Sequence, residues 1–403
     1  MDYPKSVPSA GLVNGKFVDE NPVAGTPGSL IPASWGNAVT QEIVSAISAA
    51  GMVPAENQTN QLTLAIKELA KLDPQQRFPV QVYRKNLLIN GSFDVWQRGV
   101  TNLAPNTGAF IADRFRCDWN GNAGVNISRQ NFVLGQTEVP NEPRYFLRWQ
   151  QITAGAGANT HKISQTIESV RTLAGKLATV TFWAKADSAR QVTVTVAQFF
   201  GGGSEPVVTT VGNFQLTSSW ARYSATVQVP SIAGKTQGGT GNDCLRLAFD
   251  LPLNVLQTID LAQVQLEEGP VSTPFEFRTP ADELMLCQRY YEKTFNQDVQ
   301  PGDTTGSIAG ALISTVKMGQ TTFASQPLAQ WPFKVEKRTT PSISLYKPMS
   351  NGTPGQWRSG SDQVSSANAR PYAVSTRGAW VDNSDVAVVT QSYYIHATAD
   401  AEI

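Results

Sequence analysis

Between residues 86 and 278 the sequence shows no helical periodicity. Short runs rich in β-branched and aromatic residues alternate there with turns made of glycine, asparagine and proline. Evenly spaced short runs of this kind are typical of β-sandwiches and jelly rolls. The clearest expected strands cover residues 145–152, 161–169, 178–186, 191–199, 219–229, 244–250 and 257–267. The sequence therefore predicts one all-β module in the middle of the chain.

Two segments bound this module. Residues 85–99 read KNLLINGSFDVWQRG, and residues 258–292 read TIDLAQVQLEEGPVSTPFEFRTPADELMLCQRYYE. We interpret them as the two closing edges of one sandwich. The second segment leads directly into a helix, which we expect over residues 281–294 with Asp282 in its first turn.

The chain has 403 residues, which is too long for one ordinary core. The predicted parts are residues 1–76 (an extended arm and two helices), 77–85 (a linker), 86–278 (the sandwich) and 279–403 (a connecting helix and a smaller β domain). In the last part, β-like segments are expected at residues 306–317, 342–346, 373–375 and 386–398. The predicted fold class is mainly β, with a central β-sandwich of jelly-roll type and short helices.

The N-terminal helices carry narrow apolar stripes. In the first helix, Trp35, Val39, Ile43 and Ile47 repeat every four residues, and a second helix is expected over residues 59–71. Each stripe is too narrow to form a core alone. Either the two helices pair as a hairpin, or copies from several chains form a bundle.

The charge composition restricts the partners. Charged residues make up 16% of the chain, and 32 basic residues balance 32 acidic ones. A neutral chain of low charge density lacks the electrostatic footprint of nucleic-acid or anionic-lipid binding. The longest apolar candidate, residues 43–53, is interrupted by Ser45, Ser48 and Gly51, so we expect no membrane insertion.

The N-terminus and the cysteines indicate where the chain is made. No apolar signal-peptide core follows Met1. Cys117, Cys244 and Cys287 are odd in number and far apart, which predicts reduced, mostly buried thiols. We therefore expect synthesis in a cytoplasm.

Catalytic motifs are missing from the sequence. The two histidines, His161 and His396, are far apart, and no HExxH, GxSxG or P-loop pattern occurs. A glycosidase needs two carboxylates about 5–10 Å apart, and Asp113, Asp118, Glu168 and Asp250 are available. Ordinary surface or turn carboxylates are the favoured interpretation of these residues. We expect no enzyme, no cofactor and no metal site built from Cys and His.

The sandwich offers candidate glycan-binding residues, because sugars are held by aromatic faces and planar hydrogen-bonding side chains. Strand alternation places Thr181, Trp183 and Lys185 on one face. The other outward candidates are Arg148, Gln150, Thr193, Thr195, Arg246 and Asp250. If these sets lie on one sheet, they form a polar face, and we hypothesise that this face contacts glycan around Trp183. The alternative is that Trp183 packs beneath a loop or against a neighbouring protomer.

The C-terminal part offers a second candidate site. Aromatic and arginine side chains on loops are common contact residues. The candidates in or near Gly/Ser-rich stretches are Trp357, Arg358, Tyr372 and Trp380. Trp357 and Arg358, within NGTPGQWRSGS, are predicted to be the better exposed pair. The alternative is that these aromatic residues form the core of a small β domain.

Several segments, in serial order, resemble tail-fibre (receptor-binding) proteins of tailed phages and prophages that contain a carbohydrate-binding-type jelly roll. The segments are residues 26–50 (TPGSLIPASWGNAVTQEIVSAISAA), 86–97 (NLLINGSFDVWQ), 112–115 (ADRF), 162–168 (KISQTIE), 181–186 (TFWAKA), 265–276 (QLEEGPVSTPFE), 283–293 (ELMLCQRYYEK) and 397–403 (ATADAEI). The resemblance implies a homotrimer in the virion, attached by its N-terminus to tail or baseplate proteins. The C-terminal domain would face the cell and its surface polysaccharide.

The resemblance also bears on assembly and on metal binding. Trimerisation is expected to involve the first helix and the helix near Leu284 and Tyr291. Related jelly rolls often hold a structural calcium between an acidic residue on the first strand and an aspartate near the last. Asp94 fits the first position, but Ala262 and Gln263 depart from the second. We therefore expect no calcium.

Three functional classes follow from these observations. The first is an adhesin that binds a bacterial surface glycan through several weak sites. The second is a collar or baseplate adaptor without direct receptor binding. The third, a polysaccharide depolymerase, has the least support because no catalytic constellation and no long β-helix repeat is visible.

Overall fold

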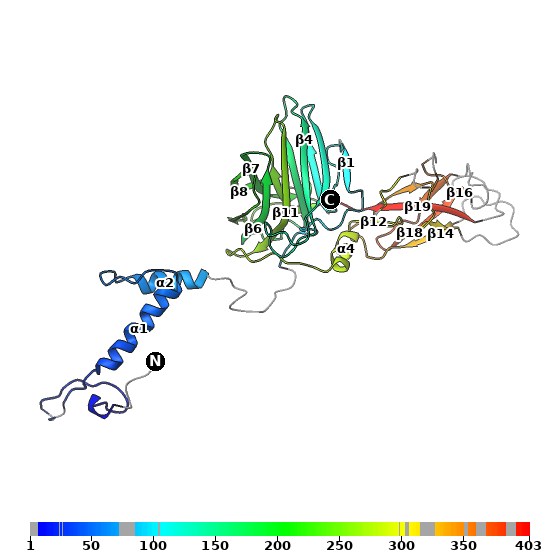
Figure 1. The fold of residues 1–403 in the computed structure, drawn as a ribbon. Coiled ribbons are helices and arrows are strands. Elements are labelled where there is room, and N and C mark those ends of the chain that lie inside the picture. The colour runs from blue at the N-terminus through cyan, green and yellow to red at the C-terminus, as the bar shows by residue number, and fades with distance from the viewer. Residues whose placement is uncertain are drawn as a thin grey trace. The chain divides into compact units, whose positions relative to one another are not determined.

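The computed structural model of the protein describes residues 7–23, 25, 27–71, 85–103, 105–297, 299–302, 306–314, 327–349, 354–359, 368–383 and 392–403. The chain divides into two compact units, Met1–Val82 and Tyr83–Ile403 (Figure 1). Residues 77–84 of the predicted linker lie outside the described residues. No helix in the described ranges is long and apolar enough to cross a bilayer.

The N-terminal unit contains a short 3-10 helix (Pro8–Ala10) and two α-helices, α1 (Ala33–Ala49) and α2 (Gln61–Lys71). The two α-helices contact each other, and Ile47 is buried. The Gln61 side chain closes the connection, because it accepts a hydrogen bond from the Ala55 amide and donates one to the Val53 carbonyl, both at 2.8 Å. The hairpin is therefore formed within one chain, and bundling between copies stays a prediction.

The middle of the chain is an antiparallel sandwich of two sheets, which confirms the predicted fold class. Its strands are β1 (Thr101–Leu103), β2 (Phe115–Trp119), β3 (Gly124–Asn131), β4 (Tyr145–Thr153), β5 (His161–Glu168), β6 (Leu177–Ala186), β7 (Arg190–Phe200), β8 (Val207–Leu216), β9 (Ala221–Gln228), β10 (Asp243–Asp250) and β11 (Gln257–Glu268). One sheet has the order β1-β3-β4-β11-β6-β9, and the other has the order β2-β5-β10-β7-β8. The seven predicted strands are confirmed, and β1, β2, β3 and β8 are additional.

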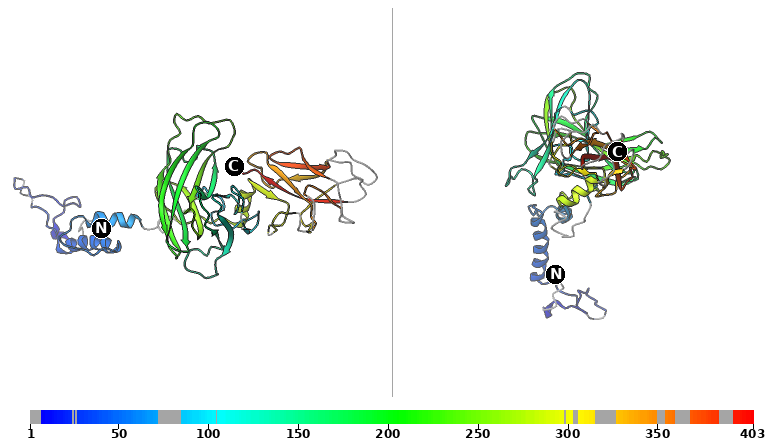
Figure 2. Two further views of the ribbon diagram at one scale, coloured as in Figure 1. Left: turned by 90° about the horizontal axis from the view of Figure 1, so that it is seen from above. Right: turned by 90° about the vertical axis from the view of Figure 1, so that its right-hand side faces the viewer.

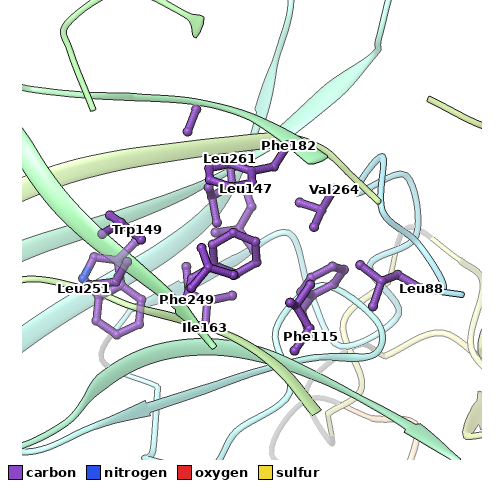
Figure 3. Close-up of a cluster of buried hydrophobic side chains, with 14 of the residues drawn as sticks. Leu88, Phe115, Leu147, Trp149, Ile163, Phe182, Phe249, Leu251, Leu261 and Val264 are labelled. Atoms are coloured by element: carbon purple, nitrogen blue, oxygen red, sulfur yellow. The ribbon is translucent and has the colours of Figure 1, made fainter. Parts of the chain in front are cut away.

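Alternating apolar residues from the two sheets form the core. On β6, Phe182 points inward, and on β10 Phe249 points inward to meet it (Figure 3). Their ring centroids are 5.0 Å apart in an edge-to-face arrangement. Such a pair adds specific geometry to the burial of two large apolar side chains, and it fixes the two sheets face to face.

The two predicted closing edges lie side by side. The Leu87 amide donates to the Leu266 carbonyl, and the Val264 amide donates to the Gly91 carbonyl, both at 2.9 Å. A Cβ atom at Gly91 would lie 2.2 Å from the Val264 carbonyl oxygen, so only glycine allows this approach. The first edge is irregular, whereas the second is β11, which carries a bulge between Ala262 and Gln265.

The predicted third helix is shorter than expected. Helix α4 spans Pro280–Gln288, and the Thr279 hydroxyl caps it by accepting from the Asp282 amide at 3.2 Å. The expected continuation to residue 294 is wrong. Tyr291–Lys293 instead form strand β12, because the edge of β19 (Tyr393–Asp400) accepts them in an antiparallel ladder.

The smaller β domain follows α4 within the same unit (Figure 2). Strand β19 pairs with β12, β13 (Leu312–Ile313), β15 (Ser342–Tyr346) and β16 (Arg358–Ser359). A second sheet has the order β14 (Pro327–Pro332), β18 (Gly378–Asn383), β17 (Ala369–Tyr372).

Of the β-like segments predicted here, residues 342–346 are confirmed. The strand predicted at 373–375 is wrong. Ala373 has a left-handed φ of 45° and lies just after the end of β17. The other two predictions are confirmed only at Leu312–Ile313 and from Tyr393 onward, and residues 315–317 and 386–391 lie outside the described residues.

Candidate functional site

The sandwich candidates lie on two different sheets. Arg148 on β4 and Trp183 and Lys185 on β6 share the outer face of the six-stranded sheet. Arg246 and Asp250 lie on β10, which pairs with β5 and β7 in the five-stranded sheet. The outer faces of two packed sheets point in opposite directions. The expected single polar face is therefore wrong.

Trp183 packs beneath a loop, as the alternative interpretation held. It lies against a cluster formed by Phe132, Phe146 and Trp220, and Phe132 belongs to the connection between β3 and β4. The ring centroids of Phe146 and Trp220 are 5.3 Å apart. The Lys185 ammonium lies 5.1 Å from the Trp220 ring centre. Glycan contact at Trp183 stays a prediction, and its half-buried side chain is partly used in packing.

Arg148 is engaged by a neighbouring strand. Its guanidinium donates to both carboxylate oxygens of Asp260 at 2.8 Å. Asp260 lies on β11 and is buried. The hydrogen bonds to Asp260 raise the pKa of Arg148. Asp260, two residues before Ala262, is thus already paired with an arginine.

The outer face of the five-stranded sheet is also internally paired. The Arg246 guanidinium lies 4.4 Å from the Phe199 ring centre. Asp250 forms an ion pair with Lys162 at 3.2 Å, and the Thr195 hydroxyl donates to it at 3.3 Å. Between these longer side chains the face consists of small, buried residues such as Ser164, Thr195 and Ala248.

Trp357 and Arg358 are not the exposed pair that was expected. Trp357 is completely buried in the core of the smaller β domain. The Arg358 guanidinium donates to the carbonyls of Gly306 and Pro348, both at 2.8 Å. The prediction is wrong because a tryptophan in a Gly/Ser-rich stretch supplies the apolar volume that a small domain needs.

Tyr372 and Trp380 form an exposed aromatic pair. They are direct cross-strand partners on β17 and β18, and 50% and 38% of their surfaces are exposed. In the part of the chain that the structure describes, Phe277 is the other exposed large aromatic residue. Gln330 on β14, also exposed, lies opposite Trp380.

The next cross-strand pair extends this surface with charged groups. Arg370 on β17 donates to both carboxylate oxygens of Asp382 on β18, at 2.8 and 3.1 Å. Arg370 is exposed, whereas Asp382 is buried. We call the surface formed by Gln330, Arg370, Tyr372, Trp380 and Asp382 the distal platform. Sequence reasoning found its aromatic residues but missed its polar ones, because the strand register was not known.

The helix residues predicted for oligomerisation have mixed environments. Trp35 packs edge-to-face on Phe17 of the N-terminal arm, with centroids 5.3 Å apart, and Val39 is half-buried. Ile43 is 38% exposed and so remains available to another copy.

Leu284 and Tyr291, near the connecting helix, also differ from each other. Leu284 is half-buried and lines a cleft. Tyr291 is buried beneath the Arg98 guanidinium, which lies 3.6 Å from its ring centre, so its expected threefold contact is wrong.

The available carboxylates and histidines have structural partners. Asp118 pairs with Arg116 at 2.7 Å and Glu168 with Arg289 at 2.7 Å. Asp113 is buried and accepts from the Gln97 amide at 2.9 Å. The ring of His161 contacts the carbonyls of Pro252 and Asn120. Among the described residues, no group of three or more His, Cys, Asp or Glu side chains is arranged to hold a metal ion.

Comparison with known proteins gives structural likenesses only. No protein-family model matches the chain, and no curated protein matches it in sequence. The enzymatically active domain of tailspike protein 4 of bacteriophage CBA120 is similar over 46% of this chain and 22% of that chain, with 16% identity and a TM-score of 0.32. The match thus spans less than a quarter of the tailspike's length.

Two similar structures are carbohydrate-binding modules. A CBM4 module matches over 45% of this chain and 98% of its own length, with 20% identity and a TM-score of 0.29. TmCBM61, solved with β-1,4-galactotriose, matches over 46% of this chain and 99% of its own length, with 12% identity and a TM-score of 0.27.

Proposed function

We propose that this protein is a tail-fibre-type adhesin that binds a bacterial surface polysaccharide through the distal platform. The observation that carries the proposal is the direct cross-strand pairing of two exposed aromatic residues, Tyr372 and Trp380. A surface that leaves two adjacent aromatic rings in water is unfavourable for a structural role alone. It is favourable when the rings receive a ligand.

The chemistry of the platform suits a sugar. Side chains directly opposite each other on an antiparallel pair have Cβ atoms about 4.5–5.5 Å apart, so the two rings form one apolar strip. The C–H face of a pyranose ring can lie on such a strip. The exposed amide of Gln330 and the guanidinium of Arg370 then flank it as hydrogen-bonding groups for the hydroxyls. Trp and Tyr are the residues that most often dominate binding energies at protein surfaces.

The N-terminal unit supports attachment to another protein or to further copies of the chain. Its exposed apolar side chains include Leu30 (70%), Ile31 (63%), Val53 (83%) and Ile66 (58%). Exposed apolar side chains in so small a unit favour coverage by a partner surface. Several copies held together in this way would multiply weak glycan sites into strong adhesion. The resemblance to tail fibres fits the same arrangement, with a homotrimer fixed to tail or baseplate proteins in the virion.

The same exposed apolar surface favours one alternative, a collar or baseplate adaptor. An adaptor needs the N-terminal contacts but does not need the distal platform. The two functions therefore differ in what they require of Tyr372 and Trp380.

The test uses the full chain and a set of purified capsular polysaccharides and O-antigens, together with bacterial strains and their polysaccharide-deficient mutants. The native protein is expected to bind at least one polysaccharide, and the double variant Tyr372→Ala/Trp380→Ala to bind it about 30-fold more weakly, the equivalent of about 2 kcal/mol. Val208→Ala, which removes part of an exposed apolar side chain on β8, is the matched control and should bind normally. No binding by the folded native protein would favour the adaptor. Equal binding by the double variant would refute the distal platform as the glycan site.

A further inference from the structure

A cleft lies in the sandwich, and none of its lining residues belongs to the distal platform. Its volume is about 520 Å³. This lies within the range of about 300–1,000 Å³ that is typical of small-molecule sites. Its walls come from the first closing edge (Ser92, Asp94 and Trp96), from β3 and β4 (Arg129 and Tyr145) and from the segment before α4 (Phe277).

The acidic wall of the cleft is centred on Asp94. The Ser92 hydroxyl donates to its carboxylate at 2.5 Å. Burial raises the pKa of Asp94, while the nearby charges of Arg144 and Arg129 act in the opposite direction. Neither arginine comes within ion-pair distance of Asp94, and neither forms an ion pair with any other described residue.

In the part of the chain that the structure describes, the arginine side chains of the basic wall, Arg129 and Arg144, form no hydrogen bond. The Arg129 guanidinium lies 4.2 Å from the Tyr145 ring centre. Stacking of this kind holds the guanidinium plane in place and leaves its N–H edges free for a bidentate acceptor. Arg144 lines the same cleft and is exposed. Two such groups form a natural receptor for a carboxylate.

Arg278 also lines the cleft, but it differs from Arg129 and Arg144 in having several partners within the protein. Its guanidinium donates to the Leu88 carbonyl at 2.9 Å and to the Asn86 carbonyl, and it pairs with Glu276 at 3.5 Å and with Glu283 at 3.4 Å. These contacts engage both terminal nitrogens of the guanidinium and neutralise its charge. Arg278 therefore belongs to the fold, whereas Arg129 and Arg144 line the cleft and form no ion pair with another described residue.

The cleft also has an apolar side. Phe277 is 39% exposed, and its ring is held edge-to-face by Phe275 with centroids 4.9 Å apart. A fixed, exposed ring facing a polar wall is suited to a ligand that is apolar on one side and polar on the other. A sugar ring has this character.

We propose that this cleft binds a saccharide unit that carries a carboxylate, such as a hexuronic acid. Arg129 and Arg144 receive the carboxylate, Asp94 and Ser92 accept hydrogen bonds from ring hydroxyls, and Phe277 contacts the apolar face. The Glu142 carboxylate, which also lines the cleft, accepts a hydrogen bond from the Gly135 amide of the same loop at 3.1 Å. The site is independent of the distal platform and does not require that platform to bind glycan.

The test measures binding of the full chain to digalacturonate, with the neutral digalactoside of the same linkage as the reference, by calorimetry or saturation-transfer NMR. The acidic disaccharide is expected to bind at least tenfold more tightly, and its affinity should fall as salt is raised. Arg129→Gln and Arg144→Gln should each weaken it about tenfold. Arg171→Gln, at an exposed arginine outside the cleft, is the matched control and should leave it unchanged.

Two further variants separate this site from the proposed function. Tyr372→Ala/Trp380→Ala should leave digalacturonate binding unchanged, so that either site can fail without the other. Arg144 is exposed, and its side chain forms no hydrogen bond or ion pair with another described residue, so Arg144→Gln keeps the test decisive even if Arg129→Gln unfolds. Equal affinity for the two disaccharides, no binding of either, or unchanged binding in Arg144→Gln would overturn the proposal.

Discussion

Arg114 and Glu402 form an ion pair inside the protein although 288 positions separate them in the sequence. Their side chains are 1% and 4% exposed. The Arg114 guanidinium also lies 3.3 Å from the Tyr290 ring centre. The residues after β19 thus return to the sandwich and join the smaller β domain to it.

The first prediction concerns this ion pair. Glu402→Ala should lower the free energy of unfolding by about 3–5 kcal/mol, because it leaves a buried guanidinium without its charge partner. Denaturant unfolding followed by circular dichroism measures the change. Glu268→Ala is the matched control, since Glu268 pairs with Lys176 at the surface with both side chains more than half exposed. The control should cost less than about 1 kcal/mol, and equal losses in the two variants would contradict the prediction.

The sandwich was predictable because its signals are local. Alternation within β6 and β10 fixed which residues point inward, and Phe182 and Phe249 do meet in the core. The two closing edges were recognisable from their residues. The end of α4 was not predictable, because β12 forms only when β19 is present as a partner.

The candidate sites were harder to predict, because they depend on pairing between distant strands. Nothing in the sequence places Arg148 and Arg246 on opposite sheets. The cleft combines residues from three segments, near Asp94, Arg129 and Phe277. Trp357 and Trp380 lie in similar Gly/Ser-rich surroundings, yet Trp357 is buried in the core of the smaller β domain and Trp380 is exposed on β18 opposite Tyr372.

The second prediction concerns the three thiols. Cys117, Cys244 and Cys287 are free and buried in the structure. Burial raises the pKa of each thiol, to about 12 for Cys117. Because the thiolate is the reactive form, we expect no alkylation of the native protein by iodoacetamide at pH 8 and three modified thiols after denaturation. Mass spectrometry counts them, and rapid labelling of the native protein would refute the prediction.

The third prediction concerns pH. His396 is buried and stacked on Phe295 with centroids 4.0 Å apart, and burial lowers its pKa below the usual 6.5. The unfolded chain therefore binds a proton more readily than the folded chain. The stabilising contribution is present above about pH 6.5 and is lost as the pH falls below it.

His396→Gln removes this titration. The free energy of unfolding of the native protein should decrease between pH 7 and pH 5, and that of the variant should decrease less. The slopes are compared, rather than the absolute values, because the substitution also changes packing. Parallel pH profiles for the two proteins would exclude His396 as the source.

The last prediction concerns assembly. On α2, Leu64 is 39% and Ile66 is 58% exposed, so the N-terminal unit leaves apolar surface uncovered. Full burial of an isoleucine side chain contributes about 1.5–3 kcal/mol. If copies of the chain associate through this surface, Ile66→Asp should weaken the association at least tenfold, since about 1.4 kcal/mol corresponds to a factor of ten.

Sedimentation equilibrium of the full chain measures this association. Leu177→Asp is the matched control, because Leu177 is 42% exposed and lies on β6 of the sandwich rather than in the N-terminal unit. We expect the native protein and the control to sediment as trimers and Ile66→Asp to shift towards monomer. The sandwich should melt at the same temperature in the native protein and in Ile66→Asp, since α2 belongs to the other compact unit. A native protein that is monomeric at micromolar concentration would contradict the prediction.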